Sequence, residues 1–511
     1  MNLRFIKLII FLTALSKIDG YSSLEVNVQC TYEVSYKGLY TCILGRVNIN
    51  SPNQILIITG NHLPGYSDED VFACIPDFAV TNNNFRFFNG EILRKFHNLK
   101  FLQIDSRKLE GFSFNAFTFC SQLQELEFFG GNVTNIYPGL LEHCQNLDIF
   151  TASQAEVWSF PGQFFGNSQK LRKFTLTVSN MNTLPENLFQ NSVNLWNVNL
   201  FGNEITTLPA NLLSNSRNLV FINLSYNLIS DPNVIENLLN GLLALEFINL
   251  RGNNFTNFNF GFFSQFSNLR NLSIGGRLTT NFTNINWTSL PRSLRELNVL
   301  NIGESITGTA FFHLTNLRRL QVSGSNIRNF DPNTFSTLEN LEILILSNCG
   351  LTTLHPQLFN NLRNVFHLSL YQNNIEELPP NIFASLENLG NGNFQFSRES
   401  LELGDNKIKE LNSNSFGHHL HMTHFSINRN EVYKIEPGIF ARNFPNLVLF
   451  SAFQNKCVSA FIQQKFDDNP YLEYCFANWL GITTTTTDGS NEISKINFII
   501  IGFFVAILWR I

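Results

Sequence analysis

Residues 195–205 read Leu195-Trp-Asn-Val198-Asn-Leu200-Phe-Gly-Asn203-Glu-Ile205, with apolar residues at the first, fourth, sixth and eleventh positions and asparagine at the ninth. The same pattern recurs from Leu219 and from Leu245. In a short strand successive side chains alternate, so the fourth and sixth positions point inward and the third, fifth and seventh point outward. One such unit cannot bury its apolar side alone, but stacked units can. The pattern therefore predicts a solenoid.

The repeat extends far beyond these three copies, mostly with a spacing of 24 residues. Copies begin at Leu99, Leu123, Leu147, Leu171, Leu195, Leu219, Leu245, Leu269, Leu294, Leu317, Leu341, Val365, Arg398, Met422 and Leu447. Weaker copies start at Asn53 and Ile75, which gives about 17 coils. A solenoid needs only about three.

The ninth position marks the point where the chain turns off the strand. We expect its asparagine amide to bond the backbone groups of that buried turn, which would otherwise lack partners. Asparagine occupies the position at Asn61, Asn83, Asn203, Asn227, Asn253, Asn373, Asn406, Asn430 and Asn455. It is replaced in two stretches, by Arg107, Gly131, Ala155 and Ser179, and by Arg277, Ile302, Ser325 and Cys349. These stretches are predicted to be less regular or more mobile.

The chain contains 52 phenylalanines in 511 residues, and many share one place in the repeat. Eighteen residues after a repeat start stand Phe117, Phe165, Phe189, Phe263, Phe312, Phe335, Phe359, Phe383, Phe416 and Phe440. Leucine or tryptophan takes the place at Leu93, Leu141, Leu213 and Trp287. The periodicity predicts an internal stack of rings on the convex side, each burying roughly 150–250 Å².

The two ends indicate export and a membrane anchor. Residues 1–20 combine basic residues with a short apolar run, which is typical of a signal peptide cleaved after Gly20 or, alternatively, after Ser16. Residues 481–497 form a threonine-rich linker, and residues 498–511 a hydrophobic tail. This order predicts GPI attachment at Asp488 or Gly489. A short single transmembrane helix from about Ile493 is the alternative.

Charge and motifs exclude several functions. The net charge is -5 and becomes -8 once the expected signal peptide and the tail beyond Asp488 are removed, so no nucleic-acid partner is predicted. No hydrolase, kinase or nucleotide-binding motif is present, so we expect neither an enzyme nor a cofactor.

Residues 53–456 resemble the extracellular leucine-rich repeats of the typical 24-residue class. They are similar to insect Toll ectodomains and to chaoptin- and connectin-like cell-surface proteins. The resemblance implies an α/β solenoid, shaped as a horseshoe with a parallel β-sheet on its concave face.

Both ends of such a solenoid need caps. We assign residues 21–52 to an N-terminal cap with a Cys30–Cys42 disulfide, and residues 457–480 to a C-terminal cap with a Cys457–Cys475 disulfide. Cys120 and Cys144 share one place in adjacent coils, so stacking predicts a third disulfide. Cys349 is predicted to be buried and free, whereas Cys74 is either free or an alternative partner for the N-terminal pair.

A histidine cluster is the most site-like local feature, consisting of His418, His419, His421 and His424. Zinc would need three or four converging ligands. A solvated polar loop is the favoured interpretation, and no metal site is predicted.

The concave face is the default binding surface of a solenoid. Its fifth positions are polar and mostly uncharged, and outward-facing aromatic residues lie beside them. Aromatic residues with arginine are typical of binding hot spots. The hypothesised binding residues are Asn199, Phe201, Phe221, Phe247, Asn249, Arg251 and Tyr371. Ordinary exposed apolar surface is the alternative.

N-glycosylation sequons occur at Asn132, Asn223, Asn254, Asn271, Asn281 and Asn286. Asn223 and Asn271 fall on concave strands, where a glycan would obstruct the centre of the face. In that case a partner would dock at an end or a lateral edge.

The sequence therefore predicts an extracellular binding protein tethered to the plasma membrane, possessing no chemistry of its own. It would recognise a protein or glycan partner in cell adhesion or recognition. An innate-immune pattern-recognition protein is the alternative.

Overall fold

The computed structural model describes residues 25–479, apart from residues 35–37, 46, 52–53, 77–83, 135, 158, 167, 256–257, 281, 283–284, 303–305, 393–399 and 464–465. The expected signal peptide, linker, anchor region and hydrophobic tail lie outside the described residues, as do Asn83 and Asn281. Among the described residues, no helix combines the length and apolar character needed to cross a bilayer.

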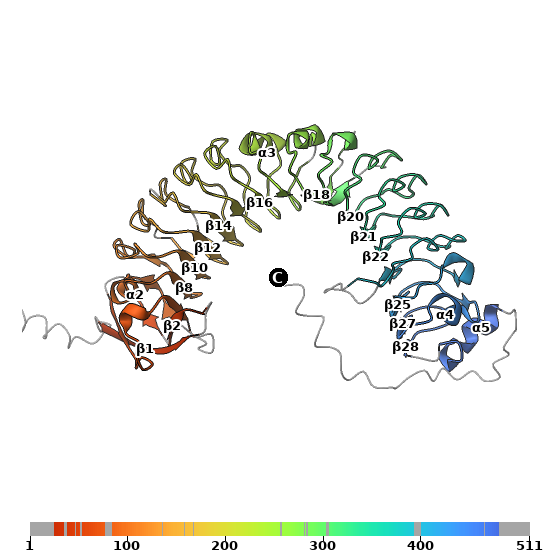
Figure 1. Cartoon of the computed structure of the whole chain (residues 1–511), viewed down its shortest axis with the longest axis horizontal. Coiled ribbons are helices and arrows are strands. Elements are labelled where there is room, and N and C mark those ends of the chain that lie inside the picture. Colours follow the sequence, from red (N-terminus) through yellow and green to blue (C-terminus); the bar gives the residue numbers. More distant parts are fainter. Residues whose placement is uncertain are drawn as a thin grey trace, which may run out of the picture.

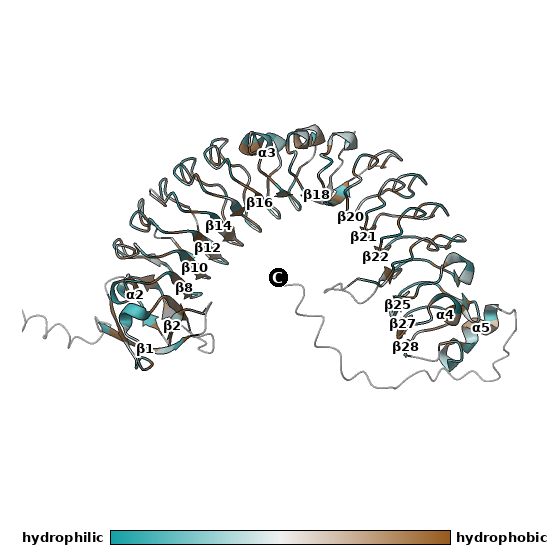
Figure 2. Ribbon diagram, in the orientation of Figure 1, coloured by the Kyte–Doolittle hydropathy of each residue, from teal (hydrophilic) through white to brown (hydrophobic). Residues whose placement is uncertain are grey.

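The chain forms an arc with its parallel strands on the concave side and turns or short helices on the convex side (Figure 1). A mixture of hydrophobic and hydrophilic residues recurs in each coil (Figure 2). The strands of the repeats are β8 (Phe101–Asp105), β10 (Glu125–Phe129), β12 (Ile149–Ser153), β14 (Lys173–Thr177), β15 (Asn197–Asn199), β16 (Phe221–Asn223), β17 (Phe247–Asn249), β18 (Asn271–Thr280), β19 (Glu296–Ile302), β20 (Arg319–Ser323), β21 (Ile343–Ile345), β22 (His367–Ser369), β23 (Leu401–Glu402), β25 (His424–Ser426) and β27 (Leu449–Ser451). Each pairs in parallel with the next, which confirms the predicted fold.

Short elements complete the coils. On the convex side lie α2 (Glu91–Lys95), α3 (Pro232–Leu239), η3 (Phe260–Gln265), η4 (Trp287–Ser289), η5 (Ser413–Ser415) and α4 (Ile439–Asn443). Two-residue strands form separate parallel pairs, namely β3 (Asn48–Ile49) with β6 (Asn84–Phe85), β7 (Phe87–Phe88) with β9 (Gly111–Phe112), β11 (Asn132–Val133) with β13 (Glu156–Val157), and β24 (Glu410–Leu411) with β26 (Lys434–Ile435).

The solenoid has about 14 turns rather than the predicted 17. The two weak copies do not form coils in the predicted register, which accounts for part of the difference. β4 (Ile55–Thr59) pairs in parallel with β1 (Glu25–Val34) at the N-terminal end, and Asn61 is exposed instead of filling a buried turn. β5 (Ala73–Pro76) pairs with β8 so that Cys74 stands beside Leu102, four residues earlier than the copy from Ile75 requires. Val71 is fully buried and occupies the place of a repeat's first leucine.

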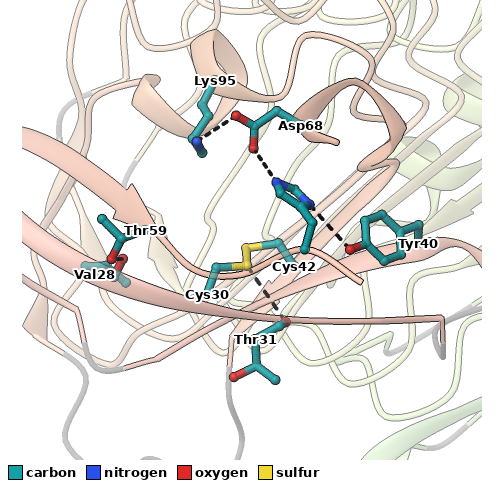
Figure 3. Close-up of a disulfide and its surroundings, with 9 residues drawn as sticks. Val28, Cys30, Thr31, Tyr40, Cys42, Thr59, Asp68 and Lys95 are labelled. Carbon is teal, nitrogen blue, oxygen red and sulfur yellow. Dashed lines mark hydrogen bonds and ion pairs between the residues drawn. A yellow bond between two sulfur atoms is a disulfide. The ribbon is translucent and has the colours of Figure 1, made fainter. Parts of the chain in front are cut away.

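The N-terminal cap joins β1 to β2 (Tyr40–Leu44) in an antiparallel pair that the Cys30–Cys42 disulfide crosses. A polar chain lies beside it, in which His62 Nε2 contacts Asp68 Oδ1 at 3.0 Å and Lys95 Nζ contacts Asp68 Oδ2 at 2.8 Å (Figure 3). Asp68 belongs to η2 (Asp68–Asp70). Burial opposes ionisation of Asp68, but the bonds from Lys95 and His62 outweigh it and lower the pKa of the carboxyl. These contacts tie the loop before β5 to α2.

The C-terminal cap consists of β28 (Phe461–Gln463), which is antiparallel to β27, followed by η6 (Pro470–Leu472) and α5 (Glu473–Trp479). The Cys457–Cys475 disulfide holds α5 to the last coil. Cys120 and Cys144 form the third predicted disulfide, with Cα atoms 4.9 Å apart. A cap that contains a disulfide therefore covers each open end of the core.

Cys74 and Cys349 are free and buried. Cys349 stands at the ninth position, where its thiol donates to the Val322 carbonyl at 3.1 Å. Burial raises the pKa of Cys349 to about 12 and also raises the pKa of Cys74. Cys74 lies beside the disulfide-bonded Cys42 in the register of β2 and β5. It has no disulfide partner in this structure.

Asparagines at the ninth position form the predicted ladder. Asn227 is typical, because its Nδ2 donates to the carbonyls of Leu200 and Leu224 at 2.9 and 3.0 Å, and its Oδ1 accepts from the Ile205 N–H at 3.1 Å. One side chain thus joins the backbones of two coils. The same bonding recurs at Asn203, Asn253, Asn373, Asn406, Asn430 and Asn455.

In most coils where the asparagine is replaced, the strands are longer, although β21, in the coil of Cys349, has three residues. β8, β10, β12 and β14 have five residues each, whereas β15, β16 and β17 have three. Continued pairing between strands satisfies the backbone groups that the amide would have bonded. The first stretch is therefore regular, contrary to prediction, and the second is irregular at β18, where the register with β19 shifts between Gly275 and Thr280. Mobility in either stretch stays a prediction.

The convex phenylalanine stack is present. Phe335, Phe359 and Phe383 are fully buried, with successive ring centroids 6.4 and 6.3 Å apart. One predicted member is wrong, because Phe312 is exposed and Phe311 occupies the stack at 6.2 Å from Phe335. The coil from Leu294 is one residue shorter than the usual 24, and its inward position comes one residue earlier in the chain.

Candidate functional site

The centre of the concave face is an open depression of about 1140 Å³. Phe221 and Phe247 lie at its edge, in the first positions of β16 and β17. The parallel register places the two residues side by side, and their half-buried rings stack at 4.3 Å between centroids and 11° between planes. Such a pair presents a flat apolar platform that can receive another side chain.

A second aromatic group lies where the same strands end. The rings of Phe201 and Tyr226 meet edge to face at 5.4 Å, and the Arg251 guanidinium lies 5.6 Å from the Tyr226 ring centroid. Asn199 stands two residues before Phe201, and Asn249 stands two residues before Arg251. Each accepts a bond with its Oδ1 from the N–H two residues on, that of Phe201 and of Arg251 respectively. The two asparagine oxygens therefore shape the end of the strand.

Tyr371, the last hypothesised binding residue, lies apart from the others. It lines a separate depression of about 750 Å³ near the C-terminal end of the sheet, together with Phe453. Arg429 Nη2 donates to Tyr371 Oη at 2.8 Å, and the same guanidinium pairs with Asp405. Hydrogen bonding from Arg429 holds the pKa of Asp405 below its ordinary value despite partial burial. The hypothesised residues thus divide between two surfaces.

Sequence reasoning missed a group of arginines lining the central depression, made up of Arg270, Arg295, Arg318 and Arg319. The first three occupy the second position of successive coils. Arg270 contacts Glu246 at 3.2 Å and Arg318 contacts Glu342 at 2.8 Å. Burial lowers the pKa of the half-buried Arg319, and the nearby Glu296 carboxylate opposes that effect. Comparing the second position across coils, instead of only the fifth, is the signal that could have found them.

The histidine cluster does not form a metal site. His419 is buried and stacks on Phe444 at 5.9 Å, while His418 Nδ1 contacts the Arg442 carbonyl at 2.8 Å and His421 is exposed. Across the described part of the chain, no group of three or more His, Cys, Asp or Glu side chains could hold a metal ion. His419 acts as a core residue.

The described sequons fall into two classes. Asn132, Asn254 and Asn286 are exposed, whereas Asn223 and Asn271 are half-buried on β16 and β18. Asn223 Oδ1 accepts bonds from the N–H and hydroxyl of Ser225, the last residue of its own sequon. Asn271 lines the central depression beside Phe247 and Glu296. A glycan there would stand within it.

Comparisons with known proteins agree with the architecture. Residues 89–220 and 183–290 match the family described as BspA type leucine rich repeat region, and residues 292–351 and 339–390 match a second leucine rich repeat family. No curated protein sequence matches the chain.

Solved structures with the same fold are distant in sequence. A leucine-rich-repeat protein of Leptospira interrogans is 21% identical with a TM-score of 0.56, covering 74% of this chain and 95% of its own. The leucine-rich-repeat domain of APL1 is 17% identical with a TM-score of 0.52, covering 83% and 93%. Toll from Drosophila, solved in complex with Spatzle, is 16% identical with a TM-score of 0.49, covering 86% and 65%. These identities establish a shared fold alone.

Proposed function

This chain carries leucine-rich repeats across residues 89–390, and from that premise we propose that it is an extracellular binding protein, tethered to the plasma membrane, that recognises a protein partner in cell adhesion or recognition. Solenoids of this kind typically serve as binding scaffolds, because their concave sheets offer a long continuous surface. Partner recognition, and not catalysis, is the function that this surface supports best.

The observation that carries the proposal is the central depression. It combines the stacked Phe221–Phe247 pair with four arginines on neighbouring strands. Aromatic and arginine side chains contribute most of the binding energy in protein interfaces, since they combine large contact area with directed hydrogen bonds. A protein or glycan ligand would therefore be expected to make its main contacts here.

Extracellular placement is supported by the three disulfides, which persist in oxidising compartments. It is also supported by the signal-like residues 1–20. The tether rests on residues 481–511, with Asp488 or Gly489 as attachment site.

The tether is tested by treating cells that express the protein with a phosphatidylinositol-specific phospholipase. GPI attachment predicts release into the medium, and Gly489→Trp, which places a bulky residue in the small-residue region, should reduce anchoring. Retention on the membrane after treatment would favour the single transmembrane helix. Absence from the cell surface would contradict the extracellular placement itself.

Partner recognition is tested with cells that display the protein. We expect Phe221→Ala combined with Phe247→Ala to abolish adhesion to partner cells, while Phe312→Ala, an exposed phenylalanine on the convex side, leaves it intact. Aggregation of expressing cells with each other would indicate homophilic adhesion. Selective binding of microbial surfaces without cell adhesion would favour pattern recognition instead.

A further inference from the structure

One arginine in the central depression lacks the partner that its neighbours have. Three ion pairs join second positions of adjacent coils, because Arg172 pairs with Asp148, Arg270 with Glu246 and Arg318 with Glu342. In each case the carboxylate comes from the adjacent coil of the same column. Each of these three arginines therefore has one acid beside it.

Arg295 departs from this pattern. Both of its neighbours in the column, Arg270 and Arg318, are themselves arginines, and each is paired on its far side. Within the described ranges, no carboxylate oxygen lies within 4.0 Å of the Arg295 or Arg319 guanidinium. Three arginines therefore occupy the second position of successive coils, and of these Arg270 and Arg318 have an ion-pair partner.

Arg319 strengthens the same site from the third position. It lies opposite Glu296 in the register of β19 and β20, and its side chain is half-buried. Burial lowers its pKa, because desolvation disfavours the charged form. A partly desolvated guanidinium gains more from an incoming anion than a fully hydrated one does. Arg295 thus offers a guanidinium without an ion pair to a ligand in the depression, and Arg319 offers one whose nearby acid is Glu296 on the adjacent strand.

We propose that Arg295 and Arg319 bind the carboxylates of an acidic segment of a partner protein, whose apolar side chain rests on the Phe221–Phe247 pair. The inference deepens the proposed function by naming the chemical class of the partner. Guanidinium forks match carboxylates in bidentate geometry. The platform lies in the two coils before Arg270, so an apolar residue and one or two acidic residues after it can be engaged together.

The surrounding charges favour a peptide over a sulfated glycan. Glu246, Glu296 and Glu342 flank the arginines, so a densely charged, extended polyanion would meet carboxylates on both sides. One or two carboxylates of a peptide fit between them.

The test uses the purified full-length protein and a fluorescein-labelled peptide in which one phenylalanine precedes two glutamates. Fluorescence anisotropy should show binding that weakens as salt rises, and a peptide with glutamines in place of the glutamates should bind much more weakly. Arg295→Gln should reduce affinity roughly ten- to hundredfold, the effect of losing a charge-assisted hydrogen bond. Arg217→Gln, an exposed arginine outside the depression, is the matched control and should bind normally.

Several results would overturn the inference. These are no binding of the acidic peptide, equal binding of the glutamine peptide, or unchanged affinity in a folded Arg295→Gln protein. Tighter binding of a heparin fragment, lost in the same variant, would assign the site to sulfated glycans.

The proposed function can fail separately. If Arg295→Gln cells still adhere while the Phe221→Ala, Phe247→Ala cells do not, then carboxylate recognition is wrong and partner binding stands. If wild-type cells bind no partner cells, the proposed function is wrong whatever the peptide does.

Discussion

Buried asparagines hold neighbouring coils together one side chain at a time. Asn227 bonds the carbonyls of Leu200, Leu224 and Ser225 and the N–H of Ile205. Each buried backbone group left without a partner costs about 1–3 kcal/mol. We expect Asn227→Ala to lower the free energy of unfolding by roughly 2–4 kcal/mol, since the backbone relaxes only partly.

Amide exchange measures this effect locally. Protection should fall at residues 200–230 in Asn227→Ala, whereas Asn218→Ala, an exposed asparagine in the same coil, should leave exchange unchanged. Equal exchange in both variants would mean that strand pairing alone satisfies the turn, as it does in the coils of β8 to β14.

His419 makes the C-terminal coils sensitive to acid. Burial lowers its pKa to about 4, against which a backbone hydrogen bond at Leu386 acts more weakly. Because the folded pKa lies below the ordinary value of 6.5, neutral His419 stabilises the fold above about pH 6.5. That stabilisation, about 3 kcal/mol, is lost as the pH falls from 6.5 toward 4.

Denaturation at a series of pH values tests this sign. We expect stability to fall between pH 6.5 and 4, and His419→Gln, which keeps a hydrogen-bond acceptor, should reduce that dependence. His421→Gln is the control, because His421 is exposed. A pH dependence unaltered by His419→Gln would assign it to carboxylates instead.

The phenylalanine stack shows how elements keep their register when a coil changes length. Phe311 is fully buried and Phe312 is 39% exposed, although the 18-residue offset predicts the reverse. Phe311→Ala should cost about 3–5 kcal/mol, because a large ring is removed from a packed core. Phe312→Ala should change stability by about 0.5 kcal/mol or less.

Thermal unfolding of Phe311→Ala and Phe312→Ala shows which of the two phenylalanines occupies the buried position. A larger loss of stability in Phe312→Ala would mean that the position 18 residues after Leu294 is the buried one. In this coil the convex position is found by counting back from the next repeat, since Phe311 stands as far before Leu317 as Phe335 stands before Leu341.

The strands from β8 to β27 could be predicted because each inward leucine repeats its neighbour's environment. The N-terminal coils could not, since β1 offers β4 a parallel partner outside the repeat and Val71 can replace a leucine. In the candidate site, the outward orientation of Phe221 could be predicted because side chains alternate between the two faces of a strand. The unpaired state of Arg295 depends on which acids stand on adjacent coils, and only comparison of whole columns reveals it.

At the scale of the whole molecule, the arc leaves one open concave face whose centre carries both the binding platform and a sequon. Asn271 stands between Phe247 and Glu296 in the sheet register. A branched glycan at this asparagine would fill a depression of about 1140 Å³ and cover the arginines beside it. Glycan occupancy therefore decides whether a partner docks at the centre or at an end of the horseshoe.

Partner binding at Arg295 requires that Asn271 carry no glycan in the active protein. Glycans on the exposed Asn132, Asn254 and Asn286 would not obstruct the concave face. Mass spectrometry of the cell-surface protein, after enzymatic deglycosylation in heavy-oxygen water, would report each site. We expect Asn271 to be unmodified and Asn271→Gln to leave adhesion unchanged, with Asn254→Gln as the control. The contrary result would be full glycan occupancy of Asn271, together with loss of adhesion when bulky residues are introduced near the caps. That result would place the partner at an end of the arc, because a glycan at the centre and an acidic peptide on Arg295 cannot occupy the same space.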